Sequence, residues 1–285
     1  PLYIKAISKL VDLPSLRKAN LKLVVDSMYG AGSGYFKELL QGGAVKIEEI
    51  KGERNPLFPG IHPEPIAKNL KDLCNLVVKS KADAGLATDG DADRIGIVDE
   101  KGNFLTQLQV YALLVFYMLE VRGERGPVVT TVTCSSMIPI LGSMYQVPVF
   151  ETPVGFKYVA PVMQKENAII GGEESGGYAF KGHVPERDGI LAGLYFLDFI
   201  VKTGKKPSEL LSDLYSKVGP HYYQRLDLEF EANKREEIIK RLEESHVKTL
   251  GGEKIKTRDR LDGFRFFMES GDWVLIRFSG TEPLI

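Results

Sequence analysis

The sequence predicts an α/β fold, with two related three-layer α/β domains followed by a smaller, truncated α+β domain with an antiparallel sheet. Three observations support this prediction. Short runs rich in β-branched residues alternate with segments of helical period over the first 218 residues, as in α/β layers. Strand-like runs dominate the last part of the chain, which favours an antiparallel sheet. A length of 285 residues exceeds what one hydrophobic core usually serves, so two or three domains are expected.

The first domain is expected to span residues 1–105. Its predicted elements are helices at 3–11, 35–40 and 66–79 and strands at 20–26, 45–50, 82–88 and 95–99. Residues 27–34 form a glycine-rich strand-to-helix turn, and they do not fit a dinucleotide-binding GxGxxG motif because Tyr35 replaces its last glycine. Residues 55–65 contain four prolines and are expected to form an extended loop.

The second and third domains are expected at residues 106–218 and 219–285. The second has predicted helices at 109–122, 136–144, 158–166, 188–203 and 207–217 and strands at 127–132, 147–152 and 168–171. The third has a predicted helix at 233–245 and strands at 222–230, 254–257, 263–268 and 273–278. The apolar run 110–119 is too short to span a bilayer and indicates a buried helix.

Charge and cysteine content exclude several classes of protein. The formal net charge is -1, whereas proteins that bind the nucleic-acid backbone usually carry a clear basic excess, so no nucleic-acid partner is expected. The two cysteines, Cys74 and Cys134, make neither a disulfide framework nor a zinc site, which favours a reduced cytoplasm. No signal peptide or membrane partner is indicated.

An acidic loop, TDGDADR, follows the predicted strand 82–88. Its three carboxylates, Asp89, Asp91 and Asp93, repel one another unless a cation or protons compensate, and small spacers let them converge. Hard oxygen ligands of this kind suit Mg²⁺. An EF-hand is excluded because Arg94 replaces its central glycine. A solvated acidic turn and a haloacid-dehalogenase-type phosphatase site, which also places a DxD after a strand, remain alternatives.

Two further loops carry polar groups suited to a sugar phosphate. In GGEESGG, Glu173 and Ser175 face one way from an extended loop and can bond adjacent sugar hydroxyls, although this string alone is a weak signal. RFSGTEP follows a predicted strand near the end of the chain. Its phosphate ligands are predicted to be the forked cation, the two hydroxyls and the turn glycine, namely Arg277, Ser279, Thr281 and Gly280.

The strings DGDADR, GEESGG and RFSGTEP, in this order, resemble the metal, sugar and phosphate loops of the phosphohexomutase family (phosphoglucomutase and phosphomannomutase). The resemblance covers essentially the whole chain. It implies that Asp89, Asp91 and Asp93 hold Mg²⁺ together with a phosphoserine oxygen from an earlier domain. It also implies that Arg94 lies beside that phosphoserine and takes part in catalysis, and that Glu173 and Ser175 contact two sugar hydroxyls.

Two flanking segments extend the resemblance. TPVGFK resembles a family loop in which Gly155 approaches the substrate and Lys157 contacts a phosphate or hydroxyl, with a catalytic role or that of a surface cation. HVPERDG resembles the family segment that ends in a basic residue before Asp-Gly, where His183 contacts substrate or has a structural role. Arg187 replaces the lysine of glucose-preferring relatives, and since arginine stays protonated it suits phosphate binding better than proton transfer. Asp188 is expected to cap the next helix.

The family moves phosphate between O1 and O6 of a hexose through a phosphoserine and a bisphosphate, which is glucose 1,6-bisphosphate for glucose. The serine motif, of the type TASHNP, is missing from this sequence, and the chain begins at Pro1 and stops at Ile285 directly after a turn. We therefore expect a fragment that is inactive alone, from a mutase that is a monomer or weak homodimer.

The choice of substrate is less constrained. Gly177 stands where some phosphomannomutase-like relatives have histidine, which favours glucose phosphate. A phosphomannomutase or a phosphoglucosamine mutase is the first alternative. An Mg²⁺-dependent sugar phosphatase, with Asp89 or Asp91 as nucleophile, and a non-catalytic sugar-phosphate binding module are alternatives of other classes.

Overall fold

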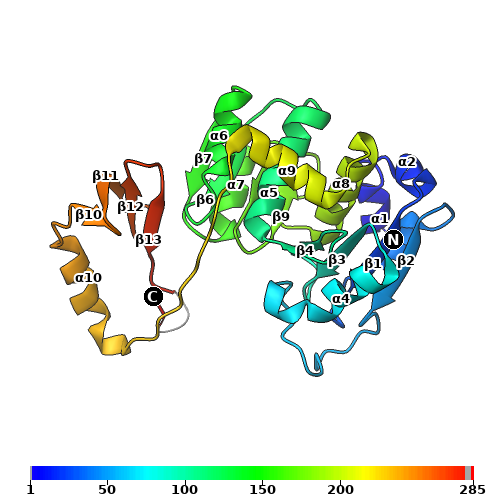
Figure 1. The fold of residues 1–285 in the computed structure, drawn as a ribbon, viewed down its shortest axis with the longest axis horizontal. Helices are drawn as coiled ribbons and strands as arrows, with labels where there is room; N and C mark the ends of the chain where they lie inside the picture. The colour runs from blue at the N-terminus through cyan, green and yellow to red at the C-terminus, as the bar shows by residue number, and fades with distance from the viewer. Residues whose placement is uncertain (1, 280–283) are drawn as a thin grey trace. The chain divides into compact units, whose positions relative to one another are not determined.

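The structure is a computed structural model that describes residues 2–279 and 284–285 (Figure 1). Contacts between residues divide the chain into two compact units. The first comprises Pro1–Glu151 and Gly155–His221, and the second comprises Thr152–Val154 and Tyr222–Ile285. Two sheets and most of the helices belong to the first unit, and an antiparallel sheet belongs to the second.

The first sheet has the strand order β2-β1-β3-β4-β5. Its strands are β1 (Lys22–Asp26), β2 (Lys46–Ile50), β3 (Ala84–Thr88), β4 (Ile95–Val98) and β5 (Phe104–Leu105). The pairs β1–β2 and β1–β3 are parallel, whereas β3–β4 and β4–β5 are antiparallel. The accompanying helices are α1 (Leu2–Ile7), α2 (Leu13–Lys18), α3 (Tyr35–Leu40) and α4 (Lys71–Ser80).

The second sheet has the order β7-β6-β8-β9. Its strands are β6 (Val128–Thr131), β7 (Val149–Thr152), β8 (Ile170–Gly172) and β9 (Tyr178–Phe180). Strands β6 and β8 are parallel, and β8 and β9 are antiparallel. Its helices are α5 (Gln107–Phe116), continued by a π-helical turn at Tyr117–Val121, α6 (Met137–Met144), α7 (Phe156–Glu166), α8 (Gly189–Thr203) and α9 (Pro207–Val218).

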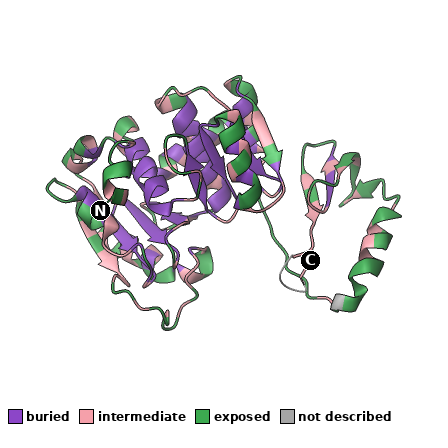
Figure 2. Cartoon of the chain, turned by 180° about the vertical axis from the view of Figure 1, so that it is seen from behind, coloured by how far each residue is buried: buried purple, intermediate pink, exposed green. Residues whose placement is uncertain are grey.

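Both sheets contribute to one large core, which makes each of them the middle of three layers. Successive side chains of a strand point to opposite faces, so Val25 faces the shared core with α3, α5 and α8, whereas Val24 packs against α4. In the second sheet Val128 faces the same shared core, and Val129 packs against α7. Figure 2 shows this buried interior along the strands and central helices of the first unit. The predicted α/β class is confirmed.

Helix α5 is buried on all sides because it packs between elements of both sheets. Thr106 caps it through a capping box with Gln109, so the helix begins at Gln107, two residues before the predicted start. The helix contacts β4 of the first sheet, and its Tyr111 hydroxyl donates to the Val129 carbonyl oxygen of β6. An apolar surface all round suits such a position. No helix in residues 2–279 is long and apolar enough to cross a membrane.

The second unit has the antiparallel sheet that the sequence predicts. Its strands are β10 (Thr249–Leu250), β11 (Glu253–Asp259), β12 (Phe264–Met268) and β13 (Trp273–Ile276), paired in this order. The helix α10 (Arg235–Glu243) follows a 3₁₀ turn at Ala232–Lys234. Phe264, Phe266 and Met268 of β12 form a small core with Ile239 and Leu242 of α10.

The strand predicted at residues 222–230 is wrong. In this segment Leu228 pairs with Ile285, and Glu229 forms an isolated bridge with Leu284. The alternating apolar side chains stay largely exposed, because no neighbouring strand among the described residues gives them a buried face. Alternating apolar and polar residues indicate a strand with one buried face. The pattern does not by itself make the backbone extended, so it predicts a strand wrongly where no neighbouring element buries that face.

Two predicted helices begin or end elsewhere. Ile66 is extended, and a 3₁₀ turn at Ala67–Asn69 precedes α4, so the helix predicted at 66–79 starts five residues late, at Lys71. The helix predicted at 3–11 ends at Ile7, and the separate helix α2 follows. Its start was readable from the sequence, since Asp12 caps it and a proline occupies its first turn.

Candidate active site

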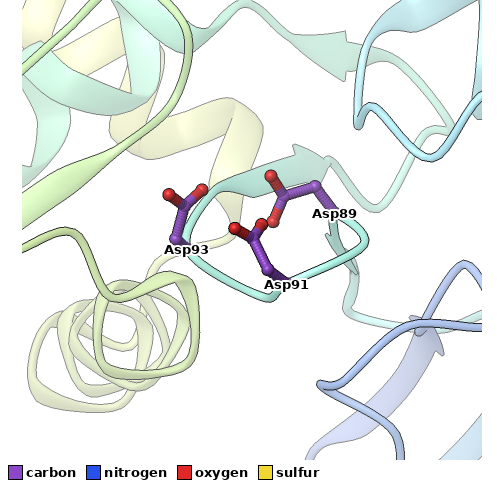
Figure 3. A group of neighbouring side chains, drawn as sticks. All are labelled: Asp89, Asp91 and Asp93. Atoms are coloured by element: carbon purple, nitrogen blue, oxygen red, sulfur yellow. The ribbon is translucent and has the colours of Figure 1, made fainter. Parts of the chain in front are cut away.

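The acidic loop between β3 and β4 brings three carboxylates together (Figure 3). One oxygen each from Asp89, Asp91 and Asp93 lies within 4.8 Å of the others. Burial, followed by the charges of Asp93 and Asp91, raises the pKa of Asp89 to about 7. One oxygen of Asp93, Oδ1, is buried without a hydrogen-bond partner in the described part of the chain. A divalent cation would relieve both the repulsion and the unsatisfied oxygen, so this donor set fits Mg²⁺.

The backbone of the loop is held in an unusual conformation. Ala92 has a φ of 64°, in the left-handed region, and its N–H donates to the Asp89 carbonyl oxygen at 3.2 Å. The Arg94 N–H donates to Asp89 Oδ1 at 3.1 Å. These bonds close a tight turn, which is why aspartates spaced by two residues face one point.

The glycine-rich turn at residues 27–34 packs against the acidic loop. The Ala31 N–H donates to the Gly90 carbonyl oxygen at 2.9 Å. A Cβ at Gly30 would lie 2.7 Å from the carbonyl oxygens of both Asp89 and Gly90, and one at Gly32 would lie 2.4 Å from the Thr88 hydroxyl. Only glycine permits so close an approach, so the turn does more than join a strand to a helix.

Arg94 lies between the carboxylates and a residue that no motif marks. Its Nε is 3.6 Å from Asp89 Oδ2 and 3.8 Å from Asp93 Oδ1, and its Nη1 is 3.4 Å from Glu64 Oε1. Glu64 comes from the proline-rich loop and was not among the predicted site residues. A carboxylate in a predicted loop is too common a feature to have revealed it.

The sugar loop is joined to the metal loop by backbone pairing. The Ile95 N–H donates to the Gly176 carbonyl oxygen at 3.0 Å, and Arg94 and Gly177 form an antiparallel bridge. The Gly189 N–H, at the start of α8, donates to the Ala92 carbonyl oxygen at 3.0 Å. The two predicted loops, far apart in the sequence, therefore form one continuous site.

Glu173, on the sugar loop, is 4% exposed. Its Oε1 accepts from the Gly155 N–H at 2.9 Å, and Gly155 has a φ of 125°, which favours glycine. Burial raises the pKa of Glu173, while the charge of Arg187 opposes the rise. Ser175, on the same loop, is half-buried. Both predicted sugar contacts thus lie on the loop that pairs with the metal loop.

Arg187 connects the two loops through its side chain. Its Nη2 is 2.6 Å from Asp93 Oδ2, and its Nη1 is 3.5 Å from Glu173 Oε2. The guanidinium carbon lies 5.7 Å from the centre of the Phe156 ring. Arg187 therefore shares its charge between a predicted metal ligand and a predicted sugar ligand.

His183 has a structural contact, one of the two roles expected for it, and its contact with substrate stays a prediction. Its Nε2 is 2.9 Å from Asp188 Oδ2, and its ring packs beside Tyr3 at 6.3 Å between centroids. The Tyr3 hydroxyl donates to the same carboxylate, and the Leu191 N–H donates to Asp188 Oδ1. The predicted capping role of Asp188 is confirmed, and its partners Tyr3 and His183 keep the adjoining Arg187 segment in place.

The remaining predicted residues belong to other segments of the chain. Lys157 is exposed, with its Nζ 5.0 Å from the Tyr158 ring, so a catalytic role for it stays a prediction. Arg277 belongs to the second unit, where its Nε is 2.9 Å from Asp262 Oδ2, and the Ser279 N–H donates to the Leu284 carbonyl oxygen. Gly280 and Thr281 lie outside the described residues.

Comparison with known proteins identifies the family. Models of the phosphoglucomutase/phosphomannomutase alpha/beta/alpha domains II and III match residues 1–102 and 107–218. A phosphoglucomutase/phosphomannomutase of Thermococcus kodakarensis is 36% identical over 283 residues, which cover 99% of this chain and 59% of the relative. A phosphoglucosamine/phosphogalactosamine mutase of Sulfurisphaera tokodaii is 32% identical over 294 residues, with coverage of 99% and 60%.

Solved structures agree with the sequence comparison. A Thermus thermophilus protein assigned as a phosphomannomutase superposes with a TM-score of 0.82 at 34% identity, over 97% of this chain and 59% of that one. The chain therefore spans about 59% of the length of the relatives that it matches. With both family models and a relative above 30% identity matched along nearly its whole length, the chain belongs to the phosphoglucomutase/phosphomannomutase family.

Proposed function

We propose that this chain is the part of a hexose-phosphate mutase that holds Mg²⁺ and binds the sugar of a hexose phosphate. The observation that carries the proposal is the pairing of the metal loop with the sugar loop. It sets the carboxylates of the acidic loop beside Glu173 and Arg187, so a cation site and a polar sugar site adjoin. Family membership gives this arrangement its reaction class, an intramolecular phosphoryl transfer.

Each residue of the site is proposed to have a distinct task. Asp89, Asp91 and Asp93 hold the ion, which when bound offsets negative charge on a transferring phosphoryl group. Arg94, at the edge of the triad, is positioned to stabilise a phosphoserine supplied from outside this sequence. Glu173 accepts hydrogen bonds from sugar hydroxyls and Ser175 bonds a neighbouring one. Arg187 and Gly155 approach the substrate, with Arg187 binding phosphate and not transferring protons.

Glucose phosphate is the proposed substrate, with glucose 1,6-bisphosphate as intermediate. Gly177 supports this choice, because some mannose-type relatives carry histidine there. Glucosamine phosphate is the second candidate, since a 32% identical relative is named for amino-sugar phosphates. Domain limits at residues 105 and 218, a cytoplasmic location and a monomeric or weakly dimeric state are proposed with it, as are the phosphate-binding roles of Arg277, Ser279, Gly280 and Thr281.

The test has two parts. Isothermal titration of the chain alone with Mg²⁺ and with glucose 1-phosphate is expected to show binding of both, without conversion to glucose 6-phosphate. A longer chain, extended to the full length of its relatives, is expected to interconvert glucose 1-phosphate and glucose 6-phosphate. Its rates with glucose, mannose and glucosamine phosphates then show which substrate it prefers. Release of free phosphate would instead support the phosphatase, and binding without turnover in the completed protein would support a binding module.

A further inference from the structure

Arg187 already contacts a carboxylate that a bound metal ion would also need. Its Nη2 lies 2.6 Å from Asp93 Oδ2, while the other oxygen of Asp93 is buried without a hydrogen-bond partner in the part of the chain that the structure describes. The guanidinium also lies 3.5 Å from Glu173 Oε2. The positive charge of Arg187 therefore interacts with Asp93 of the metal loop and with Glu173 of the sugar loop at the same time.

The stem of Arg187 is fixed, so its charged end has a limited range of positions. A Cβ at Gly177 would lie 2.2 Å from Arg187 Cδ and 2.8 Å from its Cγ, which means that the side chain lies in a slot over the glycine. Asp188, the next residue, is tied to Tyr3, His183 and the start of α8. Nε of Arg187 is buried without a hydrogen-bond partner in the described chain. Besides Asp93 and Glu173, the guanidinium has Glu186 nearby, with Nε 3.6 Å from Glu186 Oε1. A guanidinium that moves off Asp93 is therefore expected to stay beside the carboxylates of Glu173 and Glu186.

A metal ion and this guanidinium are expected to exclude one another at Asp93. Both carry positive charge, and both need the same carboxylate, so binding of one weakens binding of the other. A guanidinium released from Asp93 stays held by its stem beside the sugar loop. There it can meet the anionic group of a substrate as a forked donor.

We propose that Arg187 competes with the metal ion for Asp93, so that metal binding frees its guanidinium for the phosphate of the sugar substrate. This inference rests on the proposed function and adds a coupling between its two ligands. Because coupling between two binding sites is reciprocal, substrate phosphate that captures Arg187 also strengthens metal binding. A larger side chain at position 177 would displace the arginine stem from the position that it has here.

The test measures Mn²⁺ affinity by electron paramagnetic resonance for the unmodified chain and for Arg187→Gln, without sugar phosphate. Removing the competitor is expected to tighten Mn²⁺ binding on the order of tenfold. Arg187→Lys, which keeps the charge but loses the fork, is expected to lie between the two. Lys181→Gln removes the same charge from an exposed neighbouring position and is expected to leave the affinity unchanged. Equal or weaker Mn²⁺ binding in both Arg187 variants would overturn the proposal.

The coupling is measured by titrating glucose 1-phosphate with and without Mg²⁺. Mg²⁺ is expected to improve its affinity more in the unmodified chain than in Arg187→Gln, because only the former has a guanidinium to release. The same improvement in both chains would also overturn the proposal. If the unmodified chain binds no Mn²⁺ at all, the proposed metal site itself fails, which separates that outcome from a failure of the coupling alone.

Discussion

Glu64 belongs to no recognisable motif, yet it places a negative charge beside Arg94. The pair is 3.4 Å apart, and both side chains are about one third exposed, at 34% and 29% respectively. Ion pairs this exposed contribute little to the free energy of folding. The contact matters instead for electrostatics at the site, because it draws the Arg94 charge away from Asp89 and Asp93.

Glu64→Gln is therefore expected to weaken metal binding without a large loss of stability. Arg94 would then interact with Asp89 and Asp93 alone, and its charge would oppose a cation at the triad. We expect Mn²⁺ affinity to fall about tenfold, with unfolding free energy changed by no more than about 0.5 kcal/mol. Glu53→Gln, which removes an exposed carboxylate from the same region, is the control. Unchanged affinity in Glu64→Gln would show that Glu64 does not act on the site.

The contrast between the acidic triad and Glu64 shows how far the sequence could predict the site. Three aspartates within five residues after a strand have few ways to lie apart, so their convergence was predictable. The contact of Arg94 with Glu64 spans 30 residues and depends on the path of the proline-rich loop. The contact of Tyr3 with Asp188 is more remote still, since the two lie 185 residues apart, and no local pattern encodes such a contact.

At the scale of elements, local signals located most helices and strands, whereas tertiary contacts decided the exceptions. The helix predicted at 188–203 is observed as α8, because an aspartate cap and a closing glycine mark its ends. The alternating segment at 222–230 keeps Leu226 and Leu228 exposed and is not a strand. The sequence predicts the turn at 27–34. Its contact with the metal loop follows from the pairing of β1 with β3, which no local pattern in the sequence shows.

Gly30→Ala tests that support. Its new Cβ would lie 2.7 Å from two carbonyl oxygens of the metal loop, so the loop must shift. We expect a loss of stability of about 1–3 kcal/mol and a fall in Mn²⁺ affinity measured on folded protein. Ala31→Ser alters an exposed side chain of the same turn and keeps its backbone, so it is expected to change neither. If Gly30→Ala leaves Mn²⁺ affinity unchanged, the turn only connects β1 to α3 and does not hold the metal loop in place.

At the scale of the first unit, two sheets share one core and present their loops to one site. Composition and alternation predict the two α/β layers but not that they share a core, because both faces of each sheet are apolar. The contacts that decide this are α5 between the sheets and the pairing of the metal and sugar loops. Metal and sugar affinities should therefore respond together to a change at the junction of these loops.

Gly189→Ala places a Cβ at that junction, 2.3 Å from the Arg94 carbonyl oxygen and 2.9 Å from that of Ala92. We expect the two loops to separate, so Mn²⁺ affinity and glucose 1-phosphate affinity should fall together, each on the order of tenfold, when measured well below the unfolding temperature. The variant also loses the close fit at the start of α8, so a lower unfolding temperature is expected in calorimetry.

Gly193→Ala is the matched control, because it changes the same residue type in the same helix. Its Cβ would meet the Phe36 ring at 2.7 Å inside the core, and it touches neither loop. It should lower the unfolding temperature while both affinities stay those of the unmodified chain. Equal loss of affinity in both variants would mean that general destabilisation, and not loop separation, weakens binding. Loss of metal binding alone in Gly189→Ala would mean that the two loops act independently, since a shared junction requires both ligands to respond.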